Sequence, residues 1–152
     1  MRNQSGFSLL EMMVVIAIIA IVSALTVPNL IAWRNNAQLS AGARQIYSDL
    51  QDARKIAIKN NTLITVAFDK GSETYTIQRG GSVLASRTMP PGVTIDDAEF
   101  AATEQTGVAS FDSLGFGRDF FSADNSGAVT ISRSGGRTVT IQGDSGGSIR
   151  IL

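Results

Sequence analysis

The chain of 152 residues contains no cysteine and no histidine, and its formal net charge at pH 7 is zero. Without cysteine, no disulfide framework can hold an exported domain together, so a hydrophobic core must do so. Without histidine, both the commonest general base near neutral pH and the commonest metal ligand are missing. The balance of charge gives no overall electrostatic attraction for nucleic acid or anionic lipid.

Charge is also scarce in the N-terminal part of the chain. Between Asn3 and Trp33 the single charged residue is Glu11, which precedes a long apolar run. A carboxylate in hydrocarbon costs roughly 2.5–3.5 kcal/mol on insertion scales, so it needs a partner charge or a functional reason. Residues 7–33 are long enough to cross a bilayer as a helix, which takes about 20 residues. Arg2 is a weak positive-inside signal that favours a cytoplasmic N-terminus with the rest of the chain outside.

The residues around Glu11 resemble the start of a type IV prepilin. The matching segment is Gly6-Phe7-Ser8-Leu9-Leu10-Glu11, followed by apolar residues. Family members have glycine before a cleavage site, Phe or Met after it, Glu as the fifth mature residue and then an apolar helix. The resemblance implies that prepilin peptidase cleaves after Gly6 and methylates the new amine of Phe7. Residues 1–6 are then the leader, and the new amine lies one helical turn from Glu11, where the two charges can pair during assembly.

Two other interpretations of this segment are open. An ordinary secretory signal peptide would use Arg2 as its positive region and Val22-Ser23-Ala24 as its cleavage site. A plain membrane anchor would carry Glu11 as a carboxylate that reaches back to the membrane surface. Neither explains why Gly6, Phe7 and Glu11 fall in register.

The helix is expected to continue beyond the apolar stretch, over residues 34–60. Leu39, Ala43, Ile46, Leu50, Ala53 and Ala57 recur at spacings of three and four, which is one stripe of an amphipathic helix. A helix over about residues 8–60 would be roughly 80 Å long at 1.5 Å per residue. Pro28 is expected to kink it or to unwind it locally.

After Asn61 the apolar residues no longer recur at helical spacing but at every second position. This alternation predicts β-strands up to residue 152. Residues 62–68 and 73–78 are expected to form a hairpin, and 96–106 a surface loop. Further strands are predicted at 82–87, 93–95, 108–111, 114–116, 128–133, 137–142 and 148–152. The sequence therefore predicts an α+β, pilin-like fold. In it a long N-terminal helix, half transmembrane (7–33) and half amphipathic (34–60), packs on an all-antiparallel β domain (61–152).

This order of parts resembles the H-type minor pseudopilins and the FimT/FimU-type minor pilins, the GspH/FimT family. Supporting matches are Leu50-Gln-Asp-Ala53-Arg54 in the helix, the stretch from Phe111 to Gly117, and the final Gly147-Ser-Ile-Arg150. The resemblance implies a structural minor pseudopilin of a type II secretion system, which assembles into a helical pseudopilus through its N-terminal helix and contributes to the tip. The alternative is a minor pilin of a type IV pilus, with DNA binding for uptake.

The same resemblance implies the partners and the location of the chain. The partners are prepilin peptidase, other minor and major pilins, the inner-membrane assembly platform and the lipid bilayer. The chain is expected to cross the inner membrane once, with its C-terminal domain in the periplasm, and to enter the assembled filament. It is expected to be no enzyme and to need no cofactor.

Two turn-like segments suggest chemistry that the composition does not support. Gly143-Asp-Ser-Gly-Gly147 is similar to the nucleophile segment of serine proteases, but that reaction needs an imidazole, which the chain lacks. Asp124 and Asp144 suggest calcium, which takes six to eight oxygen ligands, and two separated turn aspartates do not supply them. Both segments are ordinary turn sequences, so no catalytic or metal site is expected.

A nucleic-acid site is the rival hypothesis from another functional class. Some FimT-type pilins bind DNA through a C-terminal Gly-Arg-x-Arg element, and Gly147-Ser148-Ile149-Arg150 has serine in place of the first arginine. Arg133, Arg137 and Arg150 lie on the last three predicted strands and could cluster. Because the exported part is neutral, nucleic acid is not expected as a partner.

Overall fold

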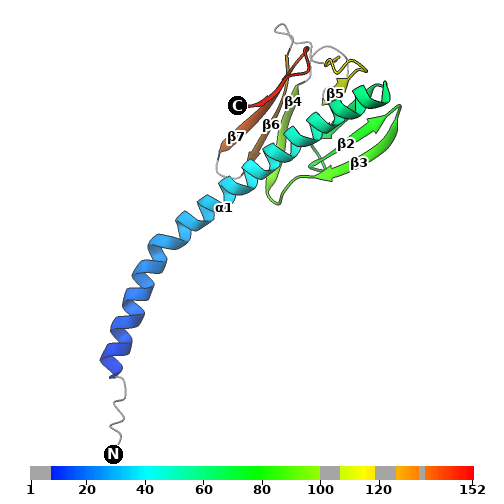
Figure 1. Ribbon diagram of the computed structural model, residues 1–152. Coiled ribbons are helices and arrows are strands. Elements are labelled where there is room, and N and C mark those ends of the chain that lie inside the picture. The colour runs from blue at the N-terminus through cyan, green and yellow to red at the C-terminus, as the bar shows by residue number, and fades with distance from the viewer. Residues whose placement is uncertain (1–7, 100–106, 119–125, 134–135) are drawn as a thin grey trace, which may run out of the picture. The chain divides into compact units, whose positions relative to one another are not determined.

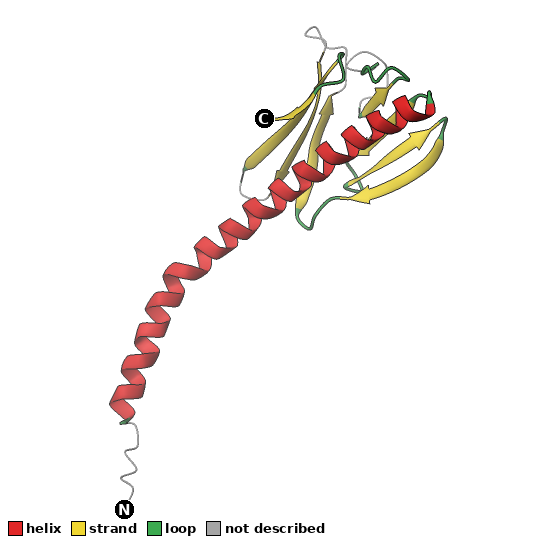
Figure 2. Cartoon of the chain, in the orientation of Figure 1, coloured by secondary structure: helices red, strands yellow, loops and turns green. Residues whose placement is uncertain are grey.

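A computed structural model of the chain describes residues 8–99, 107–118, 126–133 and 136–152. The first element is α1, a helix of 52 residues from Leu9 to Asn60 (Figures 1 and 2), which confirms the predicted length almost to the residue. The chain divides into two units between Asn36 and Ala37, so α1 contributes a segment to each.

The second unit contains two antiparallel sheets. The first has the strand order β3-β2-β1-β5 and the second the order β4-β6-β7-β8. The strands are β1 (Ile64–Asp69), β2 (Thr74–Arg79), β3 (Ser82–Thr88), β4 (Val93–Glu99), β5 (Val108–Phe111), β6 (Ser126–Arg133), β7 (Arg137–Asp144) and β8 (Ile149–Ile151). Every pairing between them is antiparallel, as the turn signals predicted.

The amphipathic segment of α1 packs on these sheets through the predicted stripe. All six of its residues are buried: Leu39, Ala43, Ile46, Leu50, Ala53 and Ala57. They join one core with inward-facing strand residues such as Val66, Tyr75 and Ile131. Gly42 also faces this core, and the position of a Cβ there would lie 3.4 Å from Val93 and 3.5 Å from Ile131. The helix can therefore approach the sheet closely at this point.

Two predictions about strands were wrong. Residues 96–99 belong to β4 and not to a loop, because a bulge between Ile95 and Asp97 lets the strand continue after its register shifts. Residues 114–116 form a turn and not a strand. One carboxylate oxygen of Asp112 accepts hydrogen bonds from the backbone N–H groups of Leu114 and Phe116, each at 2.9 Å. Gly115 between them has φ +82°, which favours glycine.

Candidate assembly helix and its anchorage

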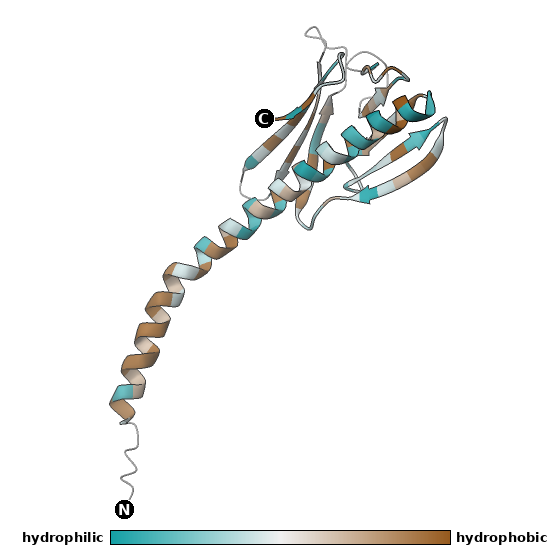
Figure 3. Cartoon of the chain, in the orientation of Figure 1, coloured by the Kyte–Doolittle hydropathy of each residue, from teal (hydrophilic) through white to brown (hydrophobic). Residues whose placement is uncertain are grey.

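The segment of α1 from Leu9 to Asn36 carries apolar side chains with no protein cover. Leu9, Ile16, Leu25 and Trp33 are each more than 60% exposed. Figure 3 shows that most residues along this part of the helix are hydrophobic. Among the described residues, α1 is long and apolar enough to cross a membrane. A helix that is apolar on every side is stable only in lipid or among other apolar helices.

Glu11 lies in the first turn of α1, where the positive end of the helix dipole favours a carboxylate. The turn is closed by the backbone N–H of Met12, which donates to the carbonyl of Ser8 at 3.2 Å. Within residues 8–99 and the later described ranges, no cation pairs with Glu11. Gly6 and Phe7 lie outside the described residues, so cleavage, methylation and the Phe7–Glu11 pair stay predictions.

Pro28 lies inside α1, which is helical on both sides of it. Proline lacks the N–H that would bond to the carbonyl of Ala24. Two residues before Pro28, the hydroxyl of Thr26 donates to the carbonyl of Val22 at 2.8 Å. The helix is thus not unwound at Pro28, and a kink there stays a prediction.

A buried carboxylate fixes the amphipathic segment to the first sheet. Asp49 on α1 accepts a hydrogen bond from the hydroxyl of Tyr75 on β2 at 2.6 Å, and one from Nε of Arg87 on β3 at 3.2 Å. Burial, together with the hydrogen bond to Asp49 and its charge, raises the pKa of Tyr75 far above its ordinary value of 10.0. The tyrosine hydroxyl therefore remains a donor over the physiological pH range.

Sequence reasoning did not single out Asp49, although the signal was present. The residue follows Ile46 by three positions and precedes Ala53 by four, which places it on the buried face of the helix. A carboxylate on such a face needs partners, and those partners are about 26 and 38 residues further along the chain. Their identity depends on the strand order and could not be derived from local patterns.

Arg54 fixes the end of the same helix to two glycine turns. Its Nε donates to the carbonyl of Gly115 at 2.9 Å, and its Nη2 donates to the carbonyl of Gly146 at 3.4 Å. The position of a Cβ on Gly147 would lie 2.1 Å from the carbonyl oxygen of Gly115, so only glycine fits there. Arg54 thus connects the stretch 111–117, which the sequence matched to the family, with the glycine-rich turn that precedes β8.

The turn predicted at 143–147 begins two residues later, because Gly143 and Asp144 are the last residues of β7 and residues 145–148 connect it to β8. Asp144 closes it by accepting, through one carboxylate oxygen, the backbone N–H of Ser148 at 2.9 Å. In the described residues no group of three Asp, Glu, His or Cys side chains is placed to hold a metal ion. Asp124, the other proposed calcium ligand, lies outside those residues.

The three arginines of the rival nucleic-acid hypothesis are only partly brought together. Arg133 and Arg137 lie opposite each other at the ends of β6 and β7. Arg150 pairs with Gln142, five residues along β7 from Arg137, or about 17 Å. Arg133 donates to the carbonyl of Pro91, and Arg150 lies 4.0 Å from the carboxylate of Asp144. The sequence did not anticipate these internal partners.

Comparison with protein families gives two matches that together cover most of the chain. The prokaryotic N-terminal methylation motif matches residues 1–27. The family described as type II transport protein GspH matches residues 42–147, well over half of the chain.

Comparison with individual proteins also finds pilins and pseudopilins. The chain is 31% identical over 115 residues to the type IV wide pilus major component PilA4 of Thermus thermophilus, covering 71% of this chain and 88% of the relative. Among solved structures, the minor pilin FimU of Pseudomonas aeruginosa has a TM-score of 0.60 at 15% identity, covering 79% of this chain and 92% of FimU. The minor pseudopilin EpsH of the type 2 secretion system of Vibrio cholerae has a TM-score of 0.57 at 16% identity, covering 76% and 96%. At such identities these structures show the pilin-like fold, as predicted. By its family matches and its curated relative, the chain belongs to the GspH family, the pilins and pseudopilins of type IV pili and type II secretion systems.

Proposed function

We propose that this chain is a structural, non-enzymatic subunit of a type II secretion pseudopilus. The observation that carries the proposal is the division of a single helix into two surfaces. From Leu9 to Trp33 the large apolar side chains of α1 are exposed, whereas its stripe from Leu39 to Ala57 is buried on the sheets. One half holds a folded domain, and the other half is free to lie in lipid and then among the helices of other subunits.

The proposed sequence of events begins in the inner membrane, with the β domain in the periplasm. Prepilin peptidase cleaves after Gly6 and methylates the amine of Phe7. The assembly platform then transfers the subunit into a filament, as a minor subunit near the tip. There the Phe7 amine and the Glu11 carboxylate both leave bulk water. Each charge alone would be costly to bury, and pairing offsets that cost.

Replacement of Glu11 tests this assembly step. Glu11→Val should leave membrane insertion and cleavage largely intact, because a more apolar helix inserts more readily. Its recovery with sheared filaments or partner subunits should fall sharply, because the amine is buried without a counter-charge. Glu11→Asp should be intermediate, and Met12→Val on the same turn is the matched control. Normal recovery of Glu11→Val would show that charge pairing is not needed for assembly.

The choice of a secretion system over a pilus rests on the match to the type II transport family. A deletion of this chain should abolish the export of secreted enzymes and leave surface pili in place. The similarity to a wide pilus component supports the alternative, a minor pilin of a type IV pilus. Loss of pili with intact secretion would establish that alternative and exclude the secretion role.

The alternative includes DNA binding, which the pair Arg133 and Arg137 supports most directly. Because Arg133 and Arg150 have contacts within the domain, we expect no binding by residues 34–152 in a filter-binding assay at moderate salt. Binding that weakens steeply with salt and is lost in Arg137→Gln, but not in the distant Arg44→Gln, would favour the DNA receptor.

A further inference from the structure

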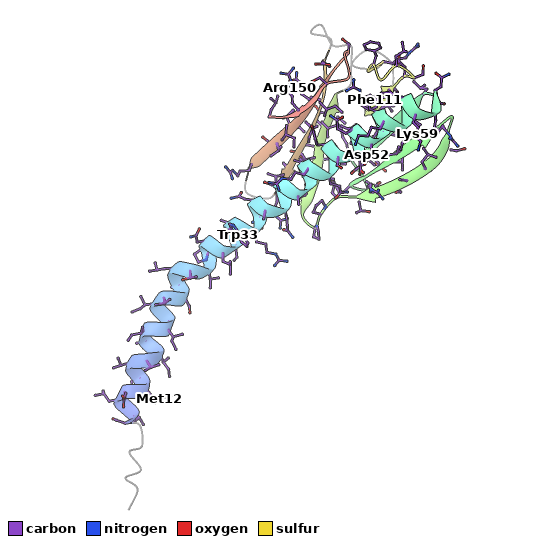
Figure 4. All side chains as sticks on the ribbon, viewed as in Figure 1. Met12, Trp33, Asp52, Lys59, Phe111 and Arg150 are labelled. Atoms are coloured by element: carbon purple, nitrogen blue, oxygen red, sulfur yellow. The ribbon has the colours of Figure 1, made fainter. Side chains whose placement is uncertain are left out.

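The uncharged part of α1 ends abruptly at Trp33 and Arg34. Trp33 is the single tryptophan of the chain, and its side chain is 67% exposed on the helix. Arg34 is the first charged residue after Glu11. Met12 and Trp33, labelled in Figure 4, mark the two ends of the uncharged run.

The length of this run matches the thickness of a membrane. Glu11 and Arg34 are 23 residues apart, which corresponds to about 35 Å of helix. The hydrocarbon core of a bilayer is about 30 Å thick. With Glu11 at one boundary, the helix reaches the opposite boundary near Ile31 and places Trp33 and Arg34 at the headgroup layer beyond it.

The chemistry of the two side chains fits that layer. Indole has a large apolar ring and one N–H donor, and tryptophan is accordingly enriched at membrane interfaces. The guanidinium of Arg34 can bind a lipid phosphate through two parallel hydrogen bonds. Beside Trp33 the side chains of Thr26, Asn29 and Leu30 border a shallow, open depression on the helix surface. The hydroxyl of Thr26 donates a hydrogen bond to the carbonyl of Val22, so this hydroxyl needs no hydrogen-bond acceptor from lipid.

We propose that Trp33 and Arg34 bind the phospholipid headgroups on the side of the membrane that carries the β domain, and so fix the depth of the subunit before assembly. The inference rests on the proposed function, because it requires α1 to cross a bilayer. It adds a specific lipid-contacting surface, with the headgroup layer as its partner. A neighbouring subunit that covers Trp33 is the other occupant to be tested.

The lone tryptophan allows its depth to be measured without ambiguity. The full chain is reconstituted in vesicles of phosphatidylcholine and phosphatidylglycerol that contain lipids brominated either near the headgroup end or near the tail end of the acyl chain. We expect the shallow bromines to quench Trp33 more than the deep ones. The control is a chain with Trp33→Phe and Leu25→Trp, because Leu25 is 75% exposed on the same helix. Its tryptophan lies about 12 Å further along the axis, and the order of quenching should reverse.

A pair of arginine variants tests the contribution of Arg34. Arg34→Leu lengthens the apolar run, so the quenching of Trp33 should shift toward the deep bromines. Arg44→Leu, an exposed position within the second unit, should leave the quenching unchanged. An unchanged profile for Arg34→Leu would overturn the role of Arg34 as the residue that fixes depth.

Three results would overturn the proposal as a whole. The first is stronger quenching of Trp33 by the deep bromines. The second is quenching by aqueous iodide and by neither bromolipid, which places Trp33 in water. The third is quenching by none of these reagents, which shows that another subunit covers it. If the chain does not float with vesicles at all, the proposed membrane stage itself fails, and that result is separate from a wrong depth.

Discussion

Replacement of Asp49 by alanine should destabilise the domain more than its position on a helix surface would suggest. The carboxylate is buried and accepts hydrogen bonds from Tyr75 and Arg87. Asp49→Ala leaves the buried hydroxyl of Tyr75 without its acceptor. Arg87, whose side chain is 48% exposed, can turn to water instead.

Three contributions determine how much the free energy of unfolding changes. A buried donor left without a partner costs about 1–3 kcal/mol. The half-exposed Arg87 adds at most about 0.5–1 kcal/mol, because solvent screens the pair. Alanine favours helix over aspartate by about 0.5–0.7 kcal/mol, which opposes the loss. We therefore expect the free energy of unfolding to fall by about 1–3 kcal/mol.

The assay is guanidinium denaturation of residues 34–152, with Asp52→Ala as the matched control. Asp52 lies on the same helix, but it is exposed and forms a solvent-exposed ion pair with Lys55, so its loss should cost under about 0.5 kcal/mol. In a double-mutant cycle with Tyr75→Phe, the two positions should couple by more than about 1 kcal/mol. Equal stability of the Asp49→Ala and Asp52→Ala variants, or no coupling to Tyr75, would refute the reasoning.

Three further predictions concern the same domain. Leu50→Ala should lower the free energy of unfolding by about 2–5 kcal/mol, since Leu50 is only 2% exposed; a change below about 0.5 kcal/mol would show that the stripe does not pack on the sheets. Gly42→Ala should raise it by about 0.5–1 kcal/mol, since a Cβ there makes ordinary contacts at 3.4–3.5 Å and alanine favours helix; destabilisation would mean that the helix cannot accept a methyl group there. The raised pKa of Tyr75 predicts stability that is complete below pH 10 and falls as the pH rises beyond 10.0, where the unfolded tyrosine ionises first; Tyr75→Phe should remove this part of the alkaline loss, and an identical pH profile would contradict it.

Most of this fold could be predicted from the sequence because its apolar residues recur at regular helical or strand spacings. The stripe from Leu39 to Ala57 has helical spacing throughout, and all its members are buried. The β-strands were predicted wherever alternation and glycine turns agreed, as at 137–142. Prediction was wrong where one side chain changed the backbone, as with Asp112, whose carboxylate holds 114–116 in a turn.

The contacts that fix the helix to the domain were harder to predict. The sequence did not single out Asp49, and it gave Arg54 only as part of a family match. Their partners lie on strands and turns between 26 and 92 residues away, and the topology alone brings them together. The candidate assembly residues Gly6, Phe7 and Glu11 could be identified from the sequence because they form one short local motif.

The most direct test of the account is the mass of the N-terminal peptide of the mature chain, isolated from the inner membrane and from sheared filaments. The account predicts one N-terminus in both fractions, a methylated Phe7, because cleavage after Gly6 precedes assembly and leaves α1 complete. An N-terminus at Leu25, after Val22-Ser23-Ala24, would establish an ordinary signal peptide that removes Glu11 and half of the apolar segment. An intact Met1 in assembled filaments would equally contradict the account.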